Sequence, residues 1–179
     1  MTKTHRTGVA GSLDDDAASA AVEPLRPEAQ LVLRQFRVVF NAVKAHFQQM
    51  ERQSGIGGAQ IWALSLIAQR PGLGVGHLAR AMDVRQSTAS NLVKTLVQRG
   101  LVVSARNAQD RRAVQLRPSP AGLAALSRAP TPFTGILPEA LERLDDETLS
   151  RLQADLRQLI TTLALDPNGR DAQTPLATL

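Results

Sequence analysis

Short hydrogen-bonding side chains and a lysine share one face of a helix that we predict over residues 86–99. Its apolar stripe falls at spacings of three and four and is formed by Ala89, Leu92, Val93 and Leu96. Serine and asparagine have modest helix propensity, so a purely structural helix would gain from replacing them. Their donors and acceptors instead match base edges in the major groove of DNA, which admits one α-helix. We predict DNA contacts from Arg85, Gln86, Ser87, Thr88, Ser90, Asn91 and Lys94. The alternative is an ordinary capped helix with a solvated face.

A second group of basic side chains lies between two short extended runs, residues 101–105 and 113–116, which we predict to form a hairpin. Arg106, Arg111 and Arg112 crowd its tip, where like charges repel unless an anion receives them. An arginine on a narrow finger suits the negative potential of a minor groove. Asp110 is expected to orient one of these arginines. The alternative is a solvated turn with a local ion pair.

The positive charge of the chain is concentrated around these two groups. Residues 60–122 hold nine lysines and arginines and two aspartates, a net charge of 9 − 2 = +7, whereas the whole chain carries +5. Such a local excess is typical of a surface that faces phosphates, although a solvated basic face without a partner would show it as well.

The elements around the two groups follow the order of a winged helix-turn-helix. We predict helices at 59–69, 75–82 and 86–99, a turn at 83–84, then the hairpin. The predicted fold class is therefore mainly α, with a two-stranded β-hairpin as the wing. A further helix opens at 119–122, where a serine precedes a proline. We assign the DNA-binding domain to residues 59–122.

The flanking segments favour dimerisation. Residues 28–52 and 138–165 repeat apolar side chains at helical spacing, and we predict that the second range forms two helices that meet near residues 145–146. The compact winged domain is too small to cover both apolar stripes. A second copy of the chain is the simplest cover. We thus predict dimerisation helices within 28–58 and 123–166, a disordered N-terminal arm at 1–27 and a flexible tail at 167–179.

Composition excludes several classes of function. The chain of 179 residues has no cysteine, which rules out disulfides and thiolate metal sites and fits a reducing cytoplasm. We expect no secretory signal and no membrane span, because charges interrupt every apolar stretch. His5, His46 and His77 are isolated, so we expect neither a metal site nor a cofactor. No nucleophile or glycine-rich phosphate loop stands in a catalytic pattern, so we do not expect an enzyme.

Four stretches resemble the MarR family of bacterial regulators: GHLARAM (76–82), STASNLVKTLVQRGLV (87–102), DRRAVQL (110–116) and SPAG (119–122). The resemblance covers about 28–165 in architecture and 60–122 in motif. It implies a homodimeric repressor on a palindromic double-stranded operator, with recognition-helix contacts from Gln86, Ser87, Ser90, Asn91 and Lys94 and wing contacts from Arg111 and Arg112. The chain departs from the family pattern in two ways: His77 replaces a common carboxylate, and Pro130 and Pro132 interrupt a helix that is often continuous.

The resemblance also implies release from DNA by a small aromatic or anionic ligand, bound between the dimer helices and the winged domain. Side chains that suit such a cleft are Phe36, Phe40, His46, Phe47 and Trp62. Aromatic residues at helical spacing can equally be plain core. A different class of function, a winged helix that binds only other proteins, predicts apolar side chains on the exposed face of the 86–99 helix, where the sequence has polar ones.

Overall fold

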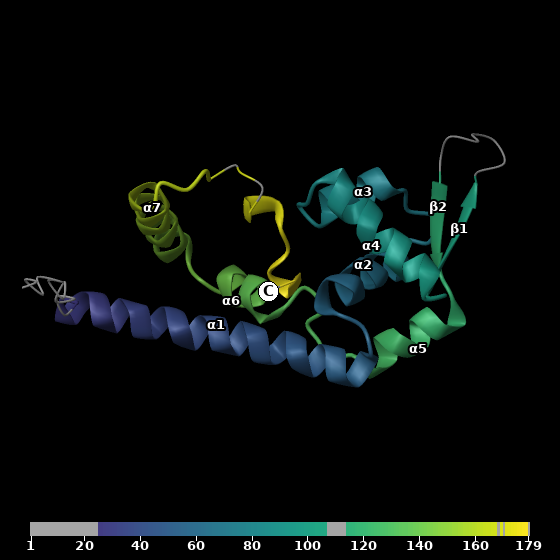
Figure 1. Cartoon of the computed structure of the whole chain (residues 1–179), viewed down its shortest axis with the longest axis horizontal. Helices are drawn as coiled ribbons and strands as arrows, with labels where there is room; N and C mark the ends of the chain where they lie inside the picture. Colours follow the sequence, from purple (N-terminus) through teal and green to yellow (C-terminus); the bar gives the residue numbers. More distant parts are fainter. Residues whose placement is uncertain (1–24, 107–113, 168, 170, 179) are drawn as a thin grey trace, which may run out of the picture.

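The protein, described here from a computed structural model, is mainly helical, and the structure describes residues 25–106, 114–167, 169 and 171–178. Helices α2 to α5 and a β-hairpin gather at the C-terminal end of the long α1, while α7 lies on the side of its N-terminal half (Figure 1). The arm predicted at residues 1–27 falls almost entirely outside the described residues. The predicted fold class, mainly α with a two-stranded wing, is confirmed.

The first helix, α1 (Pro27–Ser54), has a sequence signal at each end. Pro27 stands in the first turn, where a missing N–H costs no hydrogen bond, and Glu28 faces the positive end of the helix dipole. At the other end Gly55 adopts a left-handed conformation (φ 77°), and its N–H donates to the Glu51 carbonyl at 2.8 Å. The predicted helix at 28–52 is confirmed and continues to Ser54.

The helix-turn-helix consists of α3 (Val75–Ala81) and α4 (Gln86–Gln98), with α2 (Gly58–Gln69) packed behind them. Asp83 makes the turn between α3 and α4 with a positive φ of 51°. Gly100 ends the α4 segment in the left-handed region, with φ 68°, which lets the chain reverse into the hairpin. All three predicted helices are therefore confirmed, each to within one residue at either end.

The wing pairs β1 (Val102–Arg106) with β2 (Val114–Pro118) in antiparallel register, the first residue of one strand opposite the last of the other. The hairpin was predicted, but a third piece of extended backbone was not. Leu73, in the loop between α2 and α3, bridges to Leu116, whose N–H donates to the Leu73 carbonyl at 3.1 Å. The Gly72 N–H donates back to the Leu116 carbonyl at 2.7 Å, so β2 is anchored on both sides.

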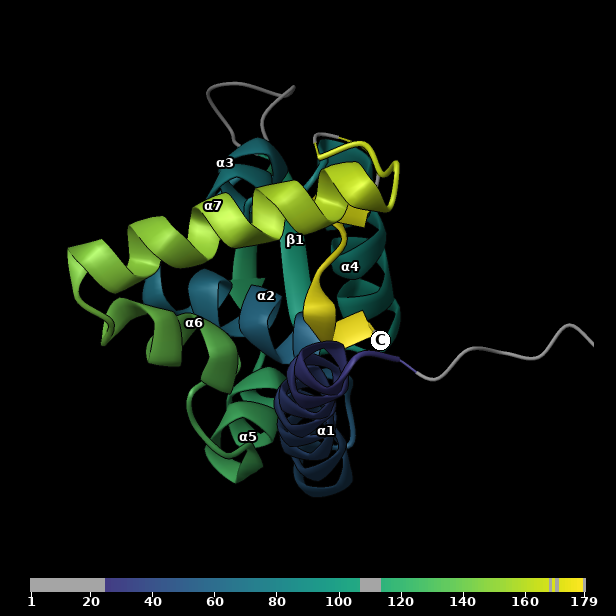
Figure 2. The same ribbon diagram turned by 90° about the vertical axis from the view of Figure 1, so that its left-hand side faces the viewer.

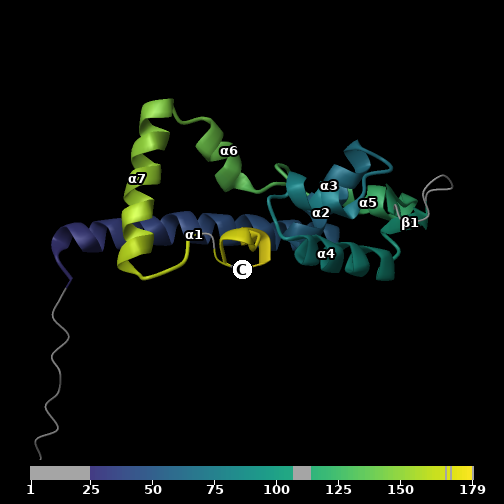
Figure 3. The same cartoon turned by 90° about the horizontal axis from the view of Figure 1, so that it is seen from above.

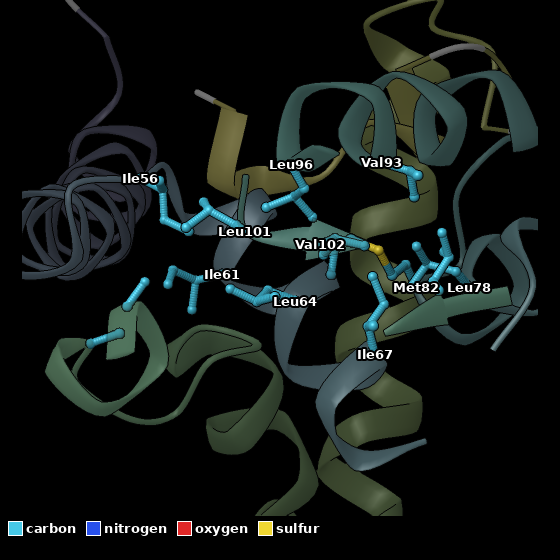
Figure 4. Packing of buried hydrophobic residues seen from close by; sticks show 14 of the residues in the cluster. Ile56, Ile61, Leu64, Ile67, Leu78, Met82, Val93, Leu96, Leu101 and Val102 are labelled. Atoms are coloured by element: carbon cyan, nitrogen blue, oxygen red, sulfur yellow. The ribbon is translucent and has the colours of Figure 1, made fainter. Parts of the chain in front are cut away.

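The core lies at this end of the molecule and joins α1 to the winged domain. Met50 and Ile56 reach it from the end of α1 and the loop that follows. Leu64, Leu96 and Leu116, from α2, α4 and β2, have no exposed surface. Figure 4 shows Leu64 of α2 and Leu96 of α4 on either side of Val102, with Leu78 and Met82 at the α3 side of the cluster. The recognition elements are thus held by one continuous apolar cluster.

The motif at 119–122 joins the wing to α5 (Pro120–Arg128). Ser119 caps the helix: its hydroxyl accepts the Gly122 N–H at 3.0 Å and donates to the Gly100 carbonyl at 2.7 Å. A Cβ on Gly122 would lie 2.2 Å from the Leu101 carbonyl oxygen, so α5 can approach the end of α4 this closely only with glycine there. Because α5 packs on α1 and α2, the domain boundary predicted at residue 122 falls inside a helix that shares the core.

Two further helices, α6 (Ile136–Glu142) and α7 (Asp146–Thr162), form the C-terminal arm seen from the side in Figure 2 and from above in Figure 3. The break between these two helices lies at residues 143–145, close to the predicted division at 145–146. Asp145 caps α7 by accepting the Thr148 N–H at 2.8 Å, and this backbone hydrogen bond holds the pKa of its carboxyl below the ordinary value. No residue of α7 is buried.

The chain then returns toward the winged domain in two short 3-10 helices, η1 (Asp171–Gln173) and η2 (Leu176–Thr178). The second contacts both α1 and α2. We predicted a flexible tail over 167–179, and hydropathy gave no sign of this packing. Flexibility of the segment remains a prediction, whereas its position against two helices is a finding of the structure.

Candidate nucleic-acid interface

The predicted recognition helix, α4, presents its two faces as the sequence indicated. Ala89 and Leu96 have no exposed surface and Val93 is 8% exposed, while Leu92 is half-buried, so the apolar stripe faces the core. The side chains on the opposite face are all exposed: Gln86, Ser87, Ser90, Asn91, Lys94 and Gln98. Thr88 is half-buried at the border between the faces. The polar row therefore faces solvent on a helix that the core holds rigidly.

Some polar side chains of α4 donate hydrogen bonds within the helix, whereas others keep their donors free for a partner. The Ser90 hydroxyl donates to the Gln86 carbonyl at 2.7 Å, so toward a partner it presents acceptor lone pairs. The Thr95 hydroxyl donates in the same way to the Asn91 carbonyl at 3.0 Å. The amide of Asn91 and the ammonium of Lys94 form no hydrogen bond with any residue that the structure describes, so their donors face solvent.

Arg85 stands immediately before α4 as its N-cap residue. Its side chain is exposed and its Nε donates to the Gln173 side-chain oxygen at 2.8 Å, which links the start of α4 to the C-terminal segment. Pattern reasoning placed Arg85 at the DNA surface and could not foresee this partner, because 88 residues separate the two in the chain.

The positive charge around α4 is not neutralised by neighbouring acids. Ion pairs among the described residues join Glu139 to Arg143 and Glu147 to Arg151, all on the C-terminal arm. Four cations of the winged domain are exposed and pair with no acid in the described part of the chain: Arg70, Arg80, Lys94 and Arg117. The charge excess is therefore available to an anionic partner.

One cation of this region has a structural role instead. Arg99, just after α4, donates to the Gly55 carbonyl at 2.7 Å and to the Gln60 side chain at 3.5 Å. It ties the end of α4 to the connection between α1 and α2. The count of nine basic residues thus overstates the number that can face DNA.

Of the three arginines predicted to contact DNA from the wing, only Arg106 lies among the described residues. Arg106 ends β1, whereas Arg111 and Arg112 lie outside the described residues, as does Asp110. Arg117, an exposed residue of β2 next to the fully buried Leu116, is a further candidate for this surface that the predicted contacts did not include. The alternation of buried leucine and exposed arginine along a strand was the signal that could have found it.

The predicted ligand residues lie at two hollows that share part of their lining. Phe36 and Phe40 stack on α1 with ring centroids 6.2 Å apart and line a groove of about 1370 Å³ between α1 and the helices α6 and α7. Phe47 and Trp62 line a small cavity of about 90 Å³ between α1 and α2, and Phe47 lines the large groove as well. His46 lines neither of them; its Nε2 donates to the Pro132 carbonyl oxygen at 3.1 Å.

Other kinds of site find no support in the described ranges. No group of three or more histidine or carboxylate side chains there is placed to hold a metal ion. None of the described helices is long and apolar enough to cross a membrane. The described surface of α4 and the adjoining hairpin offers hydrogen-bonding groups and positive charge to a partner.

Known proteins resemble this chain in sequence and in fold. Residues 54–113 match the MarR family model. A protein described as a transcriptional regulatory protein for the hcr operon of Thauera aromatica is 31% identical over 135 residues, 73% of this chain and 76% of that one. The repressor MdtR of Bacillus subtilis is 24% identical over 96 residues, 54% of this chain and 60% of its own.

A similar fold is seen in the crystal structure of a complex of S. aureus MepR with DNA (TM-score 0.50, 19% identity, 78% of this chain and 99% of that one). The match to the family model, the hcr-operon relative and the geometry of the winged helix agree. This chain belongs to the MarR family of transcriptional regulators.

Proposed function

We propose that the protein is a sequence-specific double-stranded DNA-binding repressor that acts as a homodimer in the bacterial cytoplasm. The observation that carries the proposal is the exposed polar row of α4, set on a buried apolar stripe and surrounded by cations without acidic partners. A solved relative of this fold, MepR, was crystallised with DNA, and the relative MdtR is named a repressor.

The polar row suits direct reading of base edges. One α-helix fills the major groove, and an asparagine amide offers a donor and an acceptor in the spacing that adenine presents there. Asn91 is exposed at the middle of α4 and is our candidate for that contact, worth about 1–3 kcal/mol of discrimination per half-site. Lys94, about one helical turn further along the same face, supplies charge to a guanine or a phosphate.

The contacts outside α4 are sequence-independent in this proposal. Arg106, Arg111 and Arg112 would enter the minor groove from the wing, and Arg117 would meet the backbone beside it. These contacts neutralise phosphates and release counterions, which makes affinity fall steeply with salt.

A second copy of the chain supplies the other half of the operator contact. Apolar side chains remain exposed along the arm helices: Leu31, Val32, Val38, Val39 and Phe40 on α1, and Leu149, Leu156 and Leu159 on α7. Five of them line the large groove of α1, α6 and α7, which a partner's helices would fill: Val32, Val39, Phe40, Leu156 and Leu159. Two recognition helices spaced roughly 34 Å apart would then read a palindrome of two half-sites.

An electrophoretic mobility-shift assay on the regions flanking the gene, at several salt concentrations, tests the proposal. We expect a salt-sensitive, sequence-dependent shift, with Asn91→Ala losing discrimination while it retains non-specific binding. Arg112→Ala should weaken binding to all sequences and reduce the salt slope by about one. Gln98 is exposed at the far end of the polar row but is not among the predicted DNA contacts, so Gln98→Ala serves as the matched control and should bind normally. The proposal fails if no sequence is preferred, or if Asn91→Ala and Gln98→Ala behave alike.

We further propose that a small aromatic or anionic molecule regulates DNA binding from the cleft between α1 and α2. Phe47 and Trp62 supply its aromatic lining, and the cleft lies beside the winged domain that a ligand would have to reposition. A thermal-shift panel of aromatic carboxylates and phenols tests this, since a ligand of the native state raises the melting temperature. A uniformly flat panel would contradict it.

A further inference from the structure

The cleft between α1 and α2 already holds a segment of the chain. Three consecutive residues of the C-terminal segment, Pro175, Leu176 and Ala177, line the cavity together with Phe47 and Trp62. Pro175 is buried and Ala177 is half-buried. Figure 1 shows this segment reaching back from α7 to lie beside α1 and α2. Two of the predicted ligand residues, Phe47 and Trp62, therefore share this cavity with the tail.

The cleft is shaped to fit both an aromatic ring and the tail. A Cβ on Gly58, the first residue of α2, would lie 2.3 Å from a ring carbon of Phe47 and 3.0 Å from the Ala177 Cβ. On the other side Gly135, with φ 97°, would place its Cβ 2.7 Å from the Phe47 ring. Two glycines thus admit the ring of Phe47, and one of them also admits Ala177.

The space left beside the tail is too small for an aromatic ligand. The cavity measures about 90 Å³. An apolar cavity that binds benzene measures about 150 Å³. The groove of about 1370 Å³ lies on the other side of the tail and shares Phe47, but Trp62 lines only the small cavity. A ring can therefore reach Trp62 only if the tail leaves, which makes the two occupants of this cavity mutually exclusive.

The same segment touches the recognition helix. Gln173, two residues before Pro175, accepts the hydrogen bond from Arg85 at 2.8 Å, and Arg85 is the N-cap residue of α4. Departure of the tail would break this bond and alter the surroundings of a predicted DNA contact. One short segment therefore couples occupation of the cleft to the position of the Arg85 side chain at the start of α4.

We propose that residues 171–178 are a built-in occupant of this cleft that competes with small apolar or aromatic ligands. The inference rests on the proposed function for its regulatory meaning, because the ligand is expected in the same place. A tethered segment acts at an effective concentration in the millimolar range. A free ligand binds only the fraction of molecules with an open cleft, so its apparent affinity is reduced by that fraction.

Trp62 makes the inference measurable, since it is the only tryptophan of the chain and lines the cavity. Acrylamide quenching of its fluorescence reports whether the tail is in place. Ala177→Glu puts a charge at the apolar cavity, and a chain ending at Gly169 lacks the segment. Ala172→Glu is the matched control, because Ala172 is exposed in η1 and does not line the cavity.

We expect Ala177→Glu and the shortened chain to quench more readily than the full chain and Ala172→Glu. The dye 1-anilinonaphthalene-8-sulfonate, an apolar aromatic anion, should bind both roughly tenfold more tightly, as for a cleft about one-tenth open in the full chain. Circular dichroism checks folding, and the shortened chain decides if Ala177→Glu unfolds. Equal quenching and equal dye affinity in the full chain and the shortened chain would overturn the inference, as would equal effects of the two glutamates. Neither readout involves DNA, so failure of operator binding would be a separate result.

Discussion

Replacing Gly122 by alanine tests how closely α5 must approach the end of α4. The new Cβ would lie 2.2 Å from the Leu101 carbonyl oxygen and 3.2 Å from Leu64 Cδ1. Reaching even 3.0 Å, the shortest approach that Cβ atoms tolerate, requires a shift of 3.0 − 2.2 = 0.8 Å. The obstacle is backbone, and the same carbonyl accepts the Ser119 N–H at 3.0 Å, so it cannot turn aside without breaking that bond.

The magnitude follows from two opposing effects. Overpacking of this kind costs about 1–3 kcal/mol, and here the upper half of the range applies because no flexible side chain can yield. Alanine in a helix recovers up to ~1 kcal/mol over glycine. We expect a net loss of about 1–2 kcal/mol in the free energy of unfolding, or roughly 2–8 °C in melting temperature.

The matched control is Gly76→Ala in α3. No heavy atom lies within 4 Å of the Cβ that it would add, so only the helix preference acts, and we expect stabilisation by about 0.5 kcal/mol. Urea unfolding followed by circular dichroism, at one fixed protein concentration, measures both variants. The two substitutions should change stability in opposite directions. A Gly122→Ala protein as stable as the native chain would refute the close packing of wing, α4 and α5.

Two further predictions concern helix caps. Ser119→Ala removes both hydrogen bonds of a buried hydroxyl and should lower the free energy of unfolding in urea by about 1–2 kcal/mol. The control Ser127→Ala, at an exposed position, should change it by less than ~0.5 kcal/mol. Equal effects of the two substitutions would contradict the cap. Asp145 has a lowered pKa in the folded state, so its charge stabilises the fold above the unfolded pKa of about 4 and this contribution is lost as the pH falls through the folded pKa. The urea midpoint of the native protein should therefore fall relative to that of Asp145→Asn between pH 6 and pH 3, and a constant difference would contradict the assignment.

The recognition helix could be predicted because its evidence is local. Helical spacing places Ala89, Val93 and Leu96 on one stripe, and that alone decides which residues of α4 face solvent. The turn before α4 and the reversal at Gly100 are equally local, since each depends on the conformation of one residue. The elements of the winged helix therefore followed from the sequence almost residue by residue.

Features that depend on long-range packing could not be predicted in this way. The bridge of Leu73 to Leu116 joins segments 43 residues apart by backbone alone, and no side-chain pattern records it. Arg99 reads as one more cation until its bond to the Gly55 carbonyl is seen. The C-terminal segment has too few apolar residues to signal a packed position, yet its contacts with α1 and α2 place it in the cleft.

The most direct test of the central claim is selection of bound duplexes from a random DNA library by the full chain, repeated with Asn91→Ala. We predict enrichment of a palindrome whose half-sites lie about 10 base pairs apart, with Asn91→Ala losing the preference at one base pair in each half. A library that stays unenriched with the native protein, or an unchanged preference in the variant, would contradict reading of DNA by the exposed face of α4.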